Sequence, residues 1–339
     1  MSAPDFSTPI IPDNTTPSSA AAGGTTSPLI YGAMALGGSW DRSPMTDDDV
    51  AAGFAALDTA VQLGISDIDL ADIYTAGKSE TLVGQWLATQ PDRRESVRLQ
   101  TKAGIRLPGN TAAEQAPVHY RLDEHTLRGG LEGSLERLGV DHVGRFMVHR
   151  WDPLADPTRV ARILDALVDE GLTSGVGISN VSWHRVHMLQ RHLNHPIQAI
   201  QMQMSLGHRD FVERQILANH PDAATVDFDE QLLDQAHATG IEIQAWGALD
   251  QGRYTRPAGS SPDPATAALV GQISQELDTT PESVVLAWLI RLPQGIRPVI
   301  GSSNPQRIRA CAQAAAVTEH LTQEHWYALL NSARGNNVP

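Results

Sequence analysis

The chain has 339 residues, which is long for an average domain but ordinary for a single α/β barrel with insertions. Hydrophobic residues make up 41% of it, enough for a large core, and the formal net charge of −14 argues against non-specific binding to nucleic acid. The single cysteine, Cys311, excludes an internal disulfide and a structural zinc site made of cysteines. We therefore expect a reduced, cytoplasmic protein in which Cys311 is a small apolar residue on a helix.

The first residues, 1–26, are rich in Pro, Ser, Thr, Ala and Gly and contain no basic residue. They lack the positive and apolar regions of a signal peptide, and we expect them to form a disordered tail. No run of about 18 apolar residues occurs in the chain, so neither a membrane span nor a membrane partner is expected. Residues 27–339 are assigned to one domain.

Eight short segments have the pattern of strands, and segments with helical spacing of apolar residues separate them. The expected strands are residues 29–34, the first part of 64–74, 97–101, 143–148, 176–179, 197–204, 241–246 and 297–300. The expected helices begin near Thr46, Ser79, Asp123, Asp156, Trp183, Glu230, Pro264, Pro281, Pro305 and Thr322. Long loops are expected at residues 103–122, 207–227 and 247–262.

The alternation of strands and helices predicts a parallel sheet, and the count of eight favours a closed (β/α)8 TIM barrel. The helix that begins at Pro305 is expected to run to Ala315. A doubly wound open sheet is the main alternative fold. It is disfavoured because no G-x-G-x-x-G motif follows the first expected strand.

Four polar side chains lie at or just after the ends of three consecutive expected strands: Asp69, Tyr74, Lys102 and His149. The carboxyl ends of the strands in a parallel barrel share one face, where active sites are built, so we expect these side chains to lie together. Each residue alone would be an ordinary packing or surface residue. Four of them in consecutive strand order indicate an active site.

The chemistry of these four groups is coherent. A phenol titrates at about pH 10, and a neighbouring ammonium stabilises its anion, so Lys102 is expected to lower the pKa of Tyr74. Asp69 would hold the ammonium in place, and His149 would hydrogen-bond a substrate oxygen. Such a set suits protonation of a carbonyl oxygen while hydride reduces the carbonyl carbon.

These residues and their surroundings resemble the aldo/keto reductases. The resemblance covers residue 29 to the C-terminus and rests on Asp69-Leu-Ala-Asp-Ile-Tyr74, Lys102, His149, Gly177-Ile-Ser-Asn180 and Gln201-Met-Gln-Met-Ser-Leu206. It implies an NADP(H)-dependent reductase of an aldehyde or ketone, with Tyr74 as the general acid and the other three residues of the set as its partners. The stretch Val148-His-Arg-Trp-Asp-Pro153 resembles, more narrowly, a bacterial subgroup of mostly uncharacterised members.

The resemblance also implies a nicotinamide cofactor bound at the same barrel face without a separate Rossmann domain. Ser179, Asn180 and Gln201 would hydrogen-bond its carboxamide, and Trp246 would stack on the nicotinamide ring, where Tyr or Phe is commoner in the family. The loop over the pyrophosphate would comprise Gly247, Ala248, Leu249 and Gly252.

The stretch after the last expected strand resembles the family's 2′-phosphate site. Ser302 and Asn304 bring donors to a helix N-terminus, which attracts anions, and Arg307 adds a guanidinium fork. Without the resemblance, the same residues would equally be a capped helix with a solvated arginine. Gly301 stands where many members have lysine, and Ala310-Cys311 stands where many have Glu-Asn near the adenine. NADP(H) is favoured over NAD(H).

The expected substrate is a small carbonyl compound in a fairly open pocket, with Trp40, Trp151 and Trp246 as apolar walls. Asp67 is expected one layer deeper in the barrel than Asp69, and Asp72 is a candidate for a salt bridge at the barrel rim.

No metal site is expected. Four histidines that resemble a cluster are assigned to a solvated helix face, because no carboxylate completes a His-Glu-x-x-His pattern; they are His184, His187, His192 and His195.

Two other functions stay open at this point. A non-catalytic regulator on the same fold would bind the cofactor tightly with negligible turnover, although the intact set of four residues argues against it. Another barrel enzyme, such as a metal-dependent lyase or hydrolase, would need a divalent metal in place of a nicotinamide.

Overall fold

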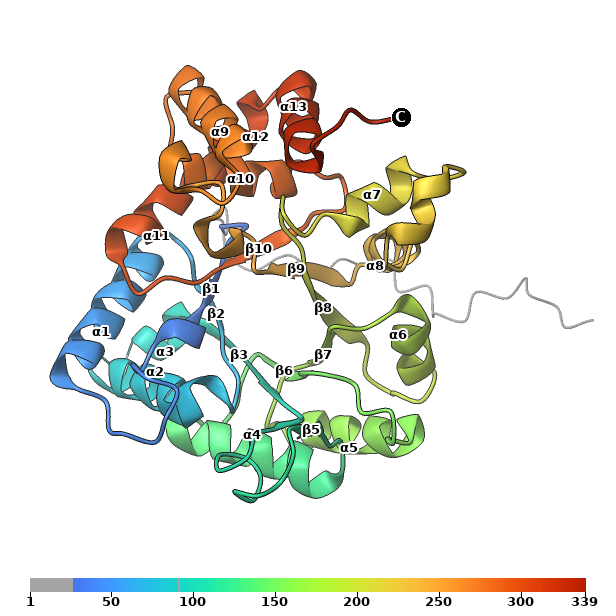
Figure 1. The fold of residues 1–339 in the computed structure, drawn as a ribbon. Coiled ribbons are helices and arrows are strands. Elements are labelled where there is room, and N and C mark those ends of the chain that lie inside the picture. The colour runs from blue at the N-terminus through green and yellow to red at the C-terminus, as the bar shows by residue number, and fades with distance from the viewer. Residues whose placement is uncertain (1–26, 91) are drawn as a thin grey trace, which may run out of the picture.

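The computed structural model describes residues 27–90 and 92–339. Eight parallel strands form a closed barrel in the order β1-β10-β9-β8-β7-β6-β3-β2. The strands lie at the centre of the molecule and the helices surround them (Figure 1). The TIM barrel is therefore confirmed, whereas the expected tail, residues 1–26, lies outside the described residues.

The barrel strands are β1 (Ile30–Gly32), β2 (Asp67–Asp69), β3 (Arg98–Ala103), β6 (Arg145–Val148), β7 (Val176–Ser179), β8 (Ile197–Gln203), β9 (Glu242–Trp246) and β10 (Arg297–Ile300). The α-helices are α1 (Asp47–Gln62), α2 (Lys78–Ala88), α3 (Arg93–Ser96), α4 (Glu124–Leu138), α5 (Pro157–Asp169), α6 (Trp183–Gln190), α7 (Asp210–Ile216), α8 (Leu232–Ala238), α9 (Pro264–Glu276), α10 (Pro281–Ile290), α11 (Pro305–Cys311), α12 (Ala314–His320) and α13 (Gln323–Arg334). All eight expected strands overlap an observed one.

Side-chain caps explain where several helices begin. Thr46 caps α1 by accepting from the Asp49 backbone N–H, while the Asp49 carboxylate accepts from the Thr46 N–H. Asp156 caps α5, and Pro157 follows it as the first helical residue. Proline suits this position because a backbone N–H there would have no partner within the helix. These local signals are readable in the sequence, and the expected starts are correct.

Three expectations about loops and helices were wrong. The long loop at 103–122 contains a two-stranded antiparallel sheet of β4 (Ile105–Arg106) and β5 (His119–Tyr120). The polar loop at 207–227 contains α7, whose Phe211 and Val212 are buried by contact with the core. The helix expected from Pro305 to Ala315 is divided into α11 and α12, which both pack against α10.

Cys311 lies on α11 and is buried, as expected, and burial raises the pKa of its thiol to about 12. A thiol with this pKa stays protonated near neutral pH and is a poor nucleophile. None of the described helices is both long enough and apolar enough to span a bilayer.

Candidate active site

Asp69, Tyr74, Lys102 and His149 come from three adjacent strands of the barrel or the residues that follow them. Asp69 ends β2, Lys102 lies near the end of β3, and His149 directly follows β6. The barrel pairs β2 with β3 and β3 with β6, so the three strand ends are neighbours. Tyr74 begins the short 3-10 helix that follows β2 (η2, Tyr74–Gly77). The structure thus brings the four expected residues together.

Lys102 and Asp69 form an ion pair within the barrel. Lys102 Nζ donates to Asp69 Oδ1 at 2.6 Å and to the Leu70 carbonyl at 2.7 Å. Burial by itself would lower the pKa of Lys102, but the Asp69 carboxylate and the Tyr74 phenol outweigh it and raise that pKa. The ammonium therefore stays charged, and it lies 5.1 Å from the centroid of the Tyr74 ring.

A strained loop places Tyr74. Thr75 and Ala76 have φ values of 45° and 59°, in the left-handed region that a β-branched residue such as Thr75 rarely adopts. The Thr75 hydroxyl holds this geometry, because it donates to the Leu36 carbonyl and accepts from the Ser79 backbone N–H. The loop that carries Tyr74 is thereby fixed to the residues after β1.

The expectation that Tyr74 has a lowered pKa was wrong. Burial raises the pKa of the phenol, and the Lys102 ammonium, which lowers it, does not fully offset burial. Tyr74 is 8% exposed and keeps its proton at neutral pH. A protonated phenol beside a fixed cation is suited to donate its proton when negative charge develops on a nearby oxygen.

His149 packs edge-on against Tyr74, with 6.0 Å between the ring centroids. Burial lowers the pKa of its imidazole well below the usual value, and the charges of Lys102 and Arg150 lower it further. The imidazole is therefore neutral at physiological pH. Its Nδ1 is buried and has no hydrogen-bond partner within the part of the chain that the structure describes.

Four residues expected to contact the nicotinamide lie at the ends of β7, β8 and β9. Asn180 adopts a φ of 54°, which asparagine tolerates, and its Nδ2 donates to Ser179 Oγ at 2.8 Å. Trp246 Nε1 donates to Asn180 Oδ1 at 3.1 Å. Gln201 Nε2 donates to Asp69 Oδ1 at 3.0 Å, which directs the side-chain oxygen of Gln201 away from that carboxylate.

The expected pyrophosphate loop follows β9 directly. Gly247 and Gly252 have φ values of 67° and 80°, which glycine adopts without strain. Ala248 is buried and Leu249 packs on the core, so the loop is anchored between its two glycines.

The expected 2′-phosphate residues follow β10. Ser302 Oγ accepts from the Asn304 backbone N–H, and Asn304 caps α11 by accepting from the Gln306 N–H. Gly301 directly follows β10 and is exposed. Arg307 lies on α11 and is also exposed.

Two of the expected apolar walls take different positions. Trp40 is 52% exposed and its ring centroid lies 6.3 Å from that of Tyr74. Trp151 is half-buried, and the Arg185 guanidinium lies 4.6 Å from its ring centroid. Trp40 thus lies beside the Tyr74 ring, whereas Trp151 follows β6 and packs against the hydrophobic core.

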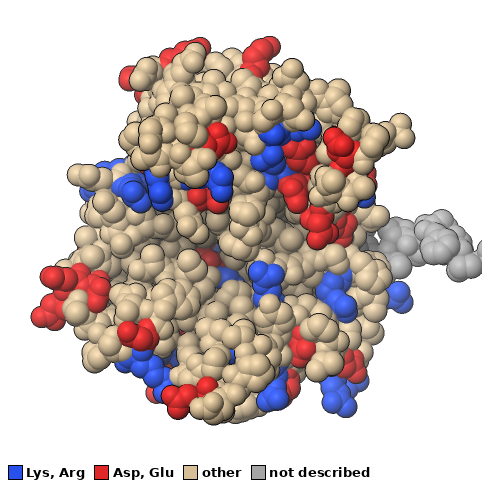
Figure 2. Space-filling view, in the orientation of Figure 1, with Lys and Arg blue, Asp and Glu red and all other residues tan. Residues whose placement is uncertain are grey.

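A cavity of about 620 Å³ opens beside Asn180, over the ends of β7 and β8. Arg150, the residue after His149, forms part of its wall. Several other polar side chains line it, including Gln203, His208, Asp210 and Asp227. Most of the face shown in Figure 2 is uncharged, and its acidic and basic side chains form small separate groups.

Asp67 and Asp72 have different surroundings. Asp67 lies at the opposite end of the barrel from the site, where it pairs with Arg98 and Arg297, as its deeper position predicted. Asp72, a candidate for a rim salt bridge, instead has a buried Oδ1 without a hydrogen-bond partner among the described residues. Burial and the charge of Glu80 raise the pKa of Asp72 to about 8. Within residues 27–90 and 92–339, no group of three or more His, Cys, Asp or Glu side chains could hold a metal ion.

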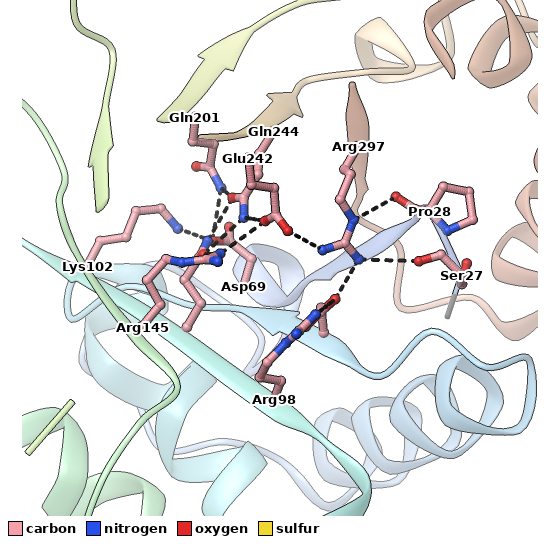
Figure 3. A network of polar contacts seen from close by, with 12 residues as sticks. Ser27, Pro28, Asp69, Arg98, Lys102, Arg145, Gln201, Glu242, Gln244 and Arg297 are labelled. Atoms are coloured by element: carbon pink, nitrogen blue, oxygen red, sulfur yellow. Dashed lines mark hydrogen bonds and ion pairs between the residues drawn. The ribbon is translucent and has the colours of Figure 1, made fainter. Parts of the chain in front are cut away.

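Sequence reasoning missed two residues that contact this site from within the barrel, Gln100 and Gln244. Gln100 Nε2 donates to Asp69 Oδ1 at 2.6 Å. Gln244 Oε1 accepts from Gln201 at 2.9 Å (Figure 3). A signal was available, because Gln100 lies two residues before Lys102 on the same strand. Alternation along a strand places residues two apart on the same face.

Similarity to known proteins identifies the family of this chain. The profile of the Aldo/keto reductase family matches residues 28–330. The chain belongs to this family. Two relatives are named 6-dehydroglucose reductase. The one from Novosphingobium aromaticivorans is 32% identical over 319 residues, covering 92% of this chain and 93% of its own. The one from Agrobacterium fabrum is 30% identical over 310 residues, covering 91% of this chain and 95% of its own.

A solved aldo-keto reductase from Klebsiella pneumoniae, in complex with NADPH, has the same fold. Its TM-score is 0.68 at 20% identity, and the match covers 93% of this chain and 92% of that one. The resemblance noted from the motifs is confirmed by the family match, and the chain is an oxidoreductase of the aldo/keto reductase family.

Proposed function

We propose that the chain is an NADP(H)-dependent carbonyl reductase in which Tyr74 is the general acid. The observation that carries the proposal is the enclosed Lys102–Asp69 pair beside a protonated Tyr74 and a neutral His149. A family structure in complex with NADPH supports the choice of cofactor.

The residues at the ends of β7 and β8 fit a nicotinamide carboxamide. A carboxamide needs both acceptors and donors, and Ser179, Asn180 and Gln201 offer a hydroxyl, an amide and a carbonyl oxygen on adjacent strands. Trp246 offers an indole face beside them. Arg307 and Ser302 would hold the 2′-phosphate.

A bound nicotinamide supplies the hydride, and the residues of this chain handle the proton. His149 would orient the carbonyl oxygen by donating from Nε2, since a neutral imidazole carries one N–H. Tyr74 would transfer its phenolic proton to that oxygen as negative charge develops. Lys102, held by Asp69, would stabilise the phenolate that remains.

Replacement of Tyr74 by Phe tests this mechanism. The variant should lose about 10²- to 10⁴-fold in kcat for NADPH-dependent aldehyde reduction, because it lacks the general acid, and should keep cofactor binding. Tyr327→Phe, a change on the exposed part of α13, is the matched control and should keep the wild-type rate. Full activity of Tyr74→Phe would refute the mechanism. Tight cofactor binding by the wild-type protein without turnover of any aldehyde would favour a regulator.

The cavity beside Asn180 favours a hydroxyl-rich carbonyl substrate. Its wall carries Asp210, Asp227 and His208, which can hydrogen-bond sugar-like hydroxyls. Both relatives described above are named for a sugar-derived substrate. A panel that compares kcat/KM for polyhydroxylated and aromatic aldehydes should show preference for the former. Asp227→Ala should reduce this preference through KM, and equal values for both classes would contradict it.

A further inference from the structure

Three glutamine side chains form a continuous polar layer inside the barrel. They are Gln100 on β3, Gln201 on β8 and Gln244 on β9, and each is at most 6% exposed. The layer is hydrogen-bonded to two carboxylates, because Gln100 and Gln201 donate to Asp69 and Gln244 donates to Glu242. Asp69, Gln201, Gln244 and Glu242 are labelled in Figure 3. The barrel register supports the arrangement, since it pairs Asp69 with Gln100 and Gln201 with Gln244.

Every N–H of the three amides has a partner. Gln100 Nε2 donates to Asp69 Oδ1 at 2.6 Å and to Gln244 Oε1 at 2.9 Å, and Gln201 Nε2 donates to the same two oxygens at 3.0 and 2.9 Å. Gln244 Nε2 donates to Gln100 Oε1 at 3.0 Å and to Glu242 Oε1 at 2.6 Å. A primary amide has two N–H bonds, so these contacts use all the donors of the layer.

The two carboxylates determine which way the amides point, together with Arg145, whose Nη1 donates to Gln100 Oε1 at 2.9 Å. An ionised carboxylate only accepts hydrogen bonds, so Gln244 must turn its nitrogen toward Glu242. Its oxygen then faces Gln100 and Gln201, whose nitrogens must turn toward it and toward Asp69. Two arginines keep Glu242 ionised, because Arg145 and Arg297 donate to its two oxygens at 3.0 and 2.8 Å.

We propose that Glu242 and Gln244 are positioning residues for the Lys102–Asp69 pair. They fix the donor direction of Gln201 and, with Arg145, that of Gln100, so that Asp69 Oδ1 accepts from two amides as well as from Lys102. An amide turned the other way would place its oxygen against Asp69, and repulsion would displace the carboxylate together with Lys102. The consequence for the reaction rests on the proposed function, whereas the direction of the amides does not.

Two variants test the proposal at a distance from the reacting groups. Gln244→Met removes the oxygen that Gln100 and Gln201 share, and should lower kcat about tenfold. It should also weaken cofactor binding, because a turned Gln201 amide no longer presents its oxygen to the carboxamide, whereas the substrate KM should stay within about twofold. Glu242→Gln keeps the shape but removes the acceptor-only group, and should lower kcat about threefold in the same way. If a variant instead folded poorly, the fraction of molecules able to bind cofactor would fall. Titration with cofactor measures this fraction.

Asp67→Asn is the matched control. Asp67 lies at the same end of the barrel as Glu242, and both carboxylates pair with Arg297. Asp67 forms no hydrogen bond with the three glutamine amides of the layer among the described residues. This variant should lower the thermal midpoint and keep the wild-type kcat per folded molecule. An equal loss of kcat in Asp67→Asn, or an unchanged kcat in folded Gln244→Met, would overturn the proposal.

A measurement without cofactor or substrate separates this proposal from the proposed function. In protein labelled with nitrogen-15 only in glutamine, the side-chain N–H signals of Gln100 and Gln201, assigned from single Gln→Met variants, should exchange slowly with solvent. Glu242→Gln should accelerate this exchange about tenfold, and Asp67→Asn should not. Unchanged exchange in Glu242→Gln would refute the fixed direction of the amides. Absence of turnover in the wild-type protein would refute only the proposed function.

Discussion

Lys102 and Asp69 meet at 2.6 Å in a part of the barrel that water does not reach, with Lys102 0% and Asp69 3% exposed. Removing one partner of such a pair leaves an uncompensated charge in the interior. Lys102→Met or Asp69→Asn alone should therefore lower the free energy of unfolding by about 3–5 kcal/mol, as measured in urea. The double variant should lose less than the sum of the two, and all three should lack reductase activity. A double variant as unstable as that sum would show that the pair does not couple.

The neutral state of His149 predicts a flat pH profile. Burial, Lys102 and Arg150 lower the pKa of the imidazole well below its usual value, so it does not titrate between about pH 6 and pH 8. His149 should therefore contribute no limb to the kcat profile for carbonyl reduction in this range, as measured in a buffer of constant ionic strength. A limb in the wild-type profile near pH 6.5 that His149→Asn abolishes would contradict this prediction.

Asp72 should make the protein less stable as pH rises. Its pKa is raised from 3.8 to about 8, so between these values the folded state binds a proton that the unfolded state has lost. Stability from this group is complete below the unfolded pKa and is lost as pH rises through the folded one. Asp72→Asn should therefore reduce the difference in thermal midpoint between about pH 5 and about pH 9. An unchanged difference would show that the group is ionised in the folded protein.

Arg307 should decide the preference for NADPH over NADH. Its guanidinium would form charge-assisted hydrogen bonds with the 2′-phosphate, so Arg307→Ala should raise the KM for NADPH about 10- to 100-fold and leave that for NADH unchanged. Arg309→Ala is the matched control, because Arg309 lies on the same helix and is also exposed. Similar effects of both substitutions would indicate a general influence of positive charge on α11.

The fold was predictable wherever local signals repeat. The strands predicted from apolar runs agree with the structure. So do the helix starts predicted from capping residues such as Thr46 and Asp156. Helix α7 was missed because its seven residues owe their helical state to the burial of Phe211 and Val212, which a polar local sequence does not show. The division between α11 and α12 has no proline or glycine to mark it.

The sequence predicted which residues form the candidate site, but not their charge states or hydrogen bonds. Asp69, Tyr74, Lys102 and His149 follow from the ends of consecutive strands, which share one face in any parallel barrel. The glutamine layer was missed because its residues occupy inward positions where apolar residues are usual, and their partners lie on strands far apart in the sequence.

The sequence by itself determined the order of the strands and the chemical type of the residue at each strand end, because both depend on periodicity along the chain. The tertiary structure decided the charge states and the direction of the hydrogen bonds. Tyr74 has a raised pKa and His149 a lowered one because closure of the barrel removes water from them. Desolvation, and pairs such as Gln201 with Asp69, arise only when distant strands are brought together.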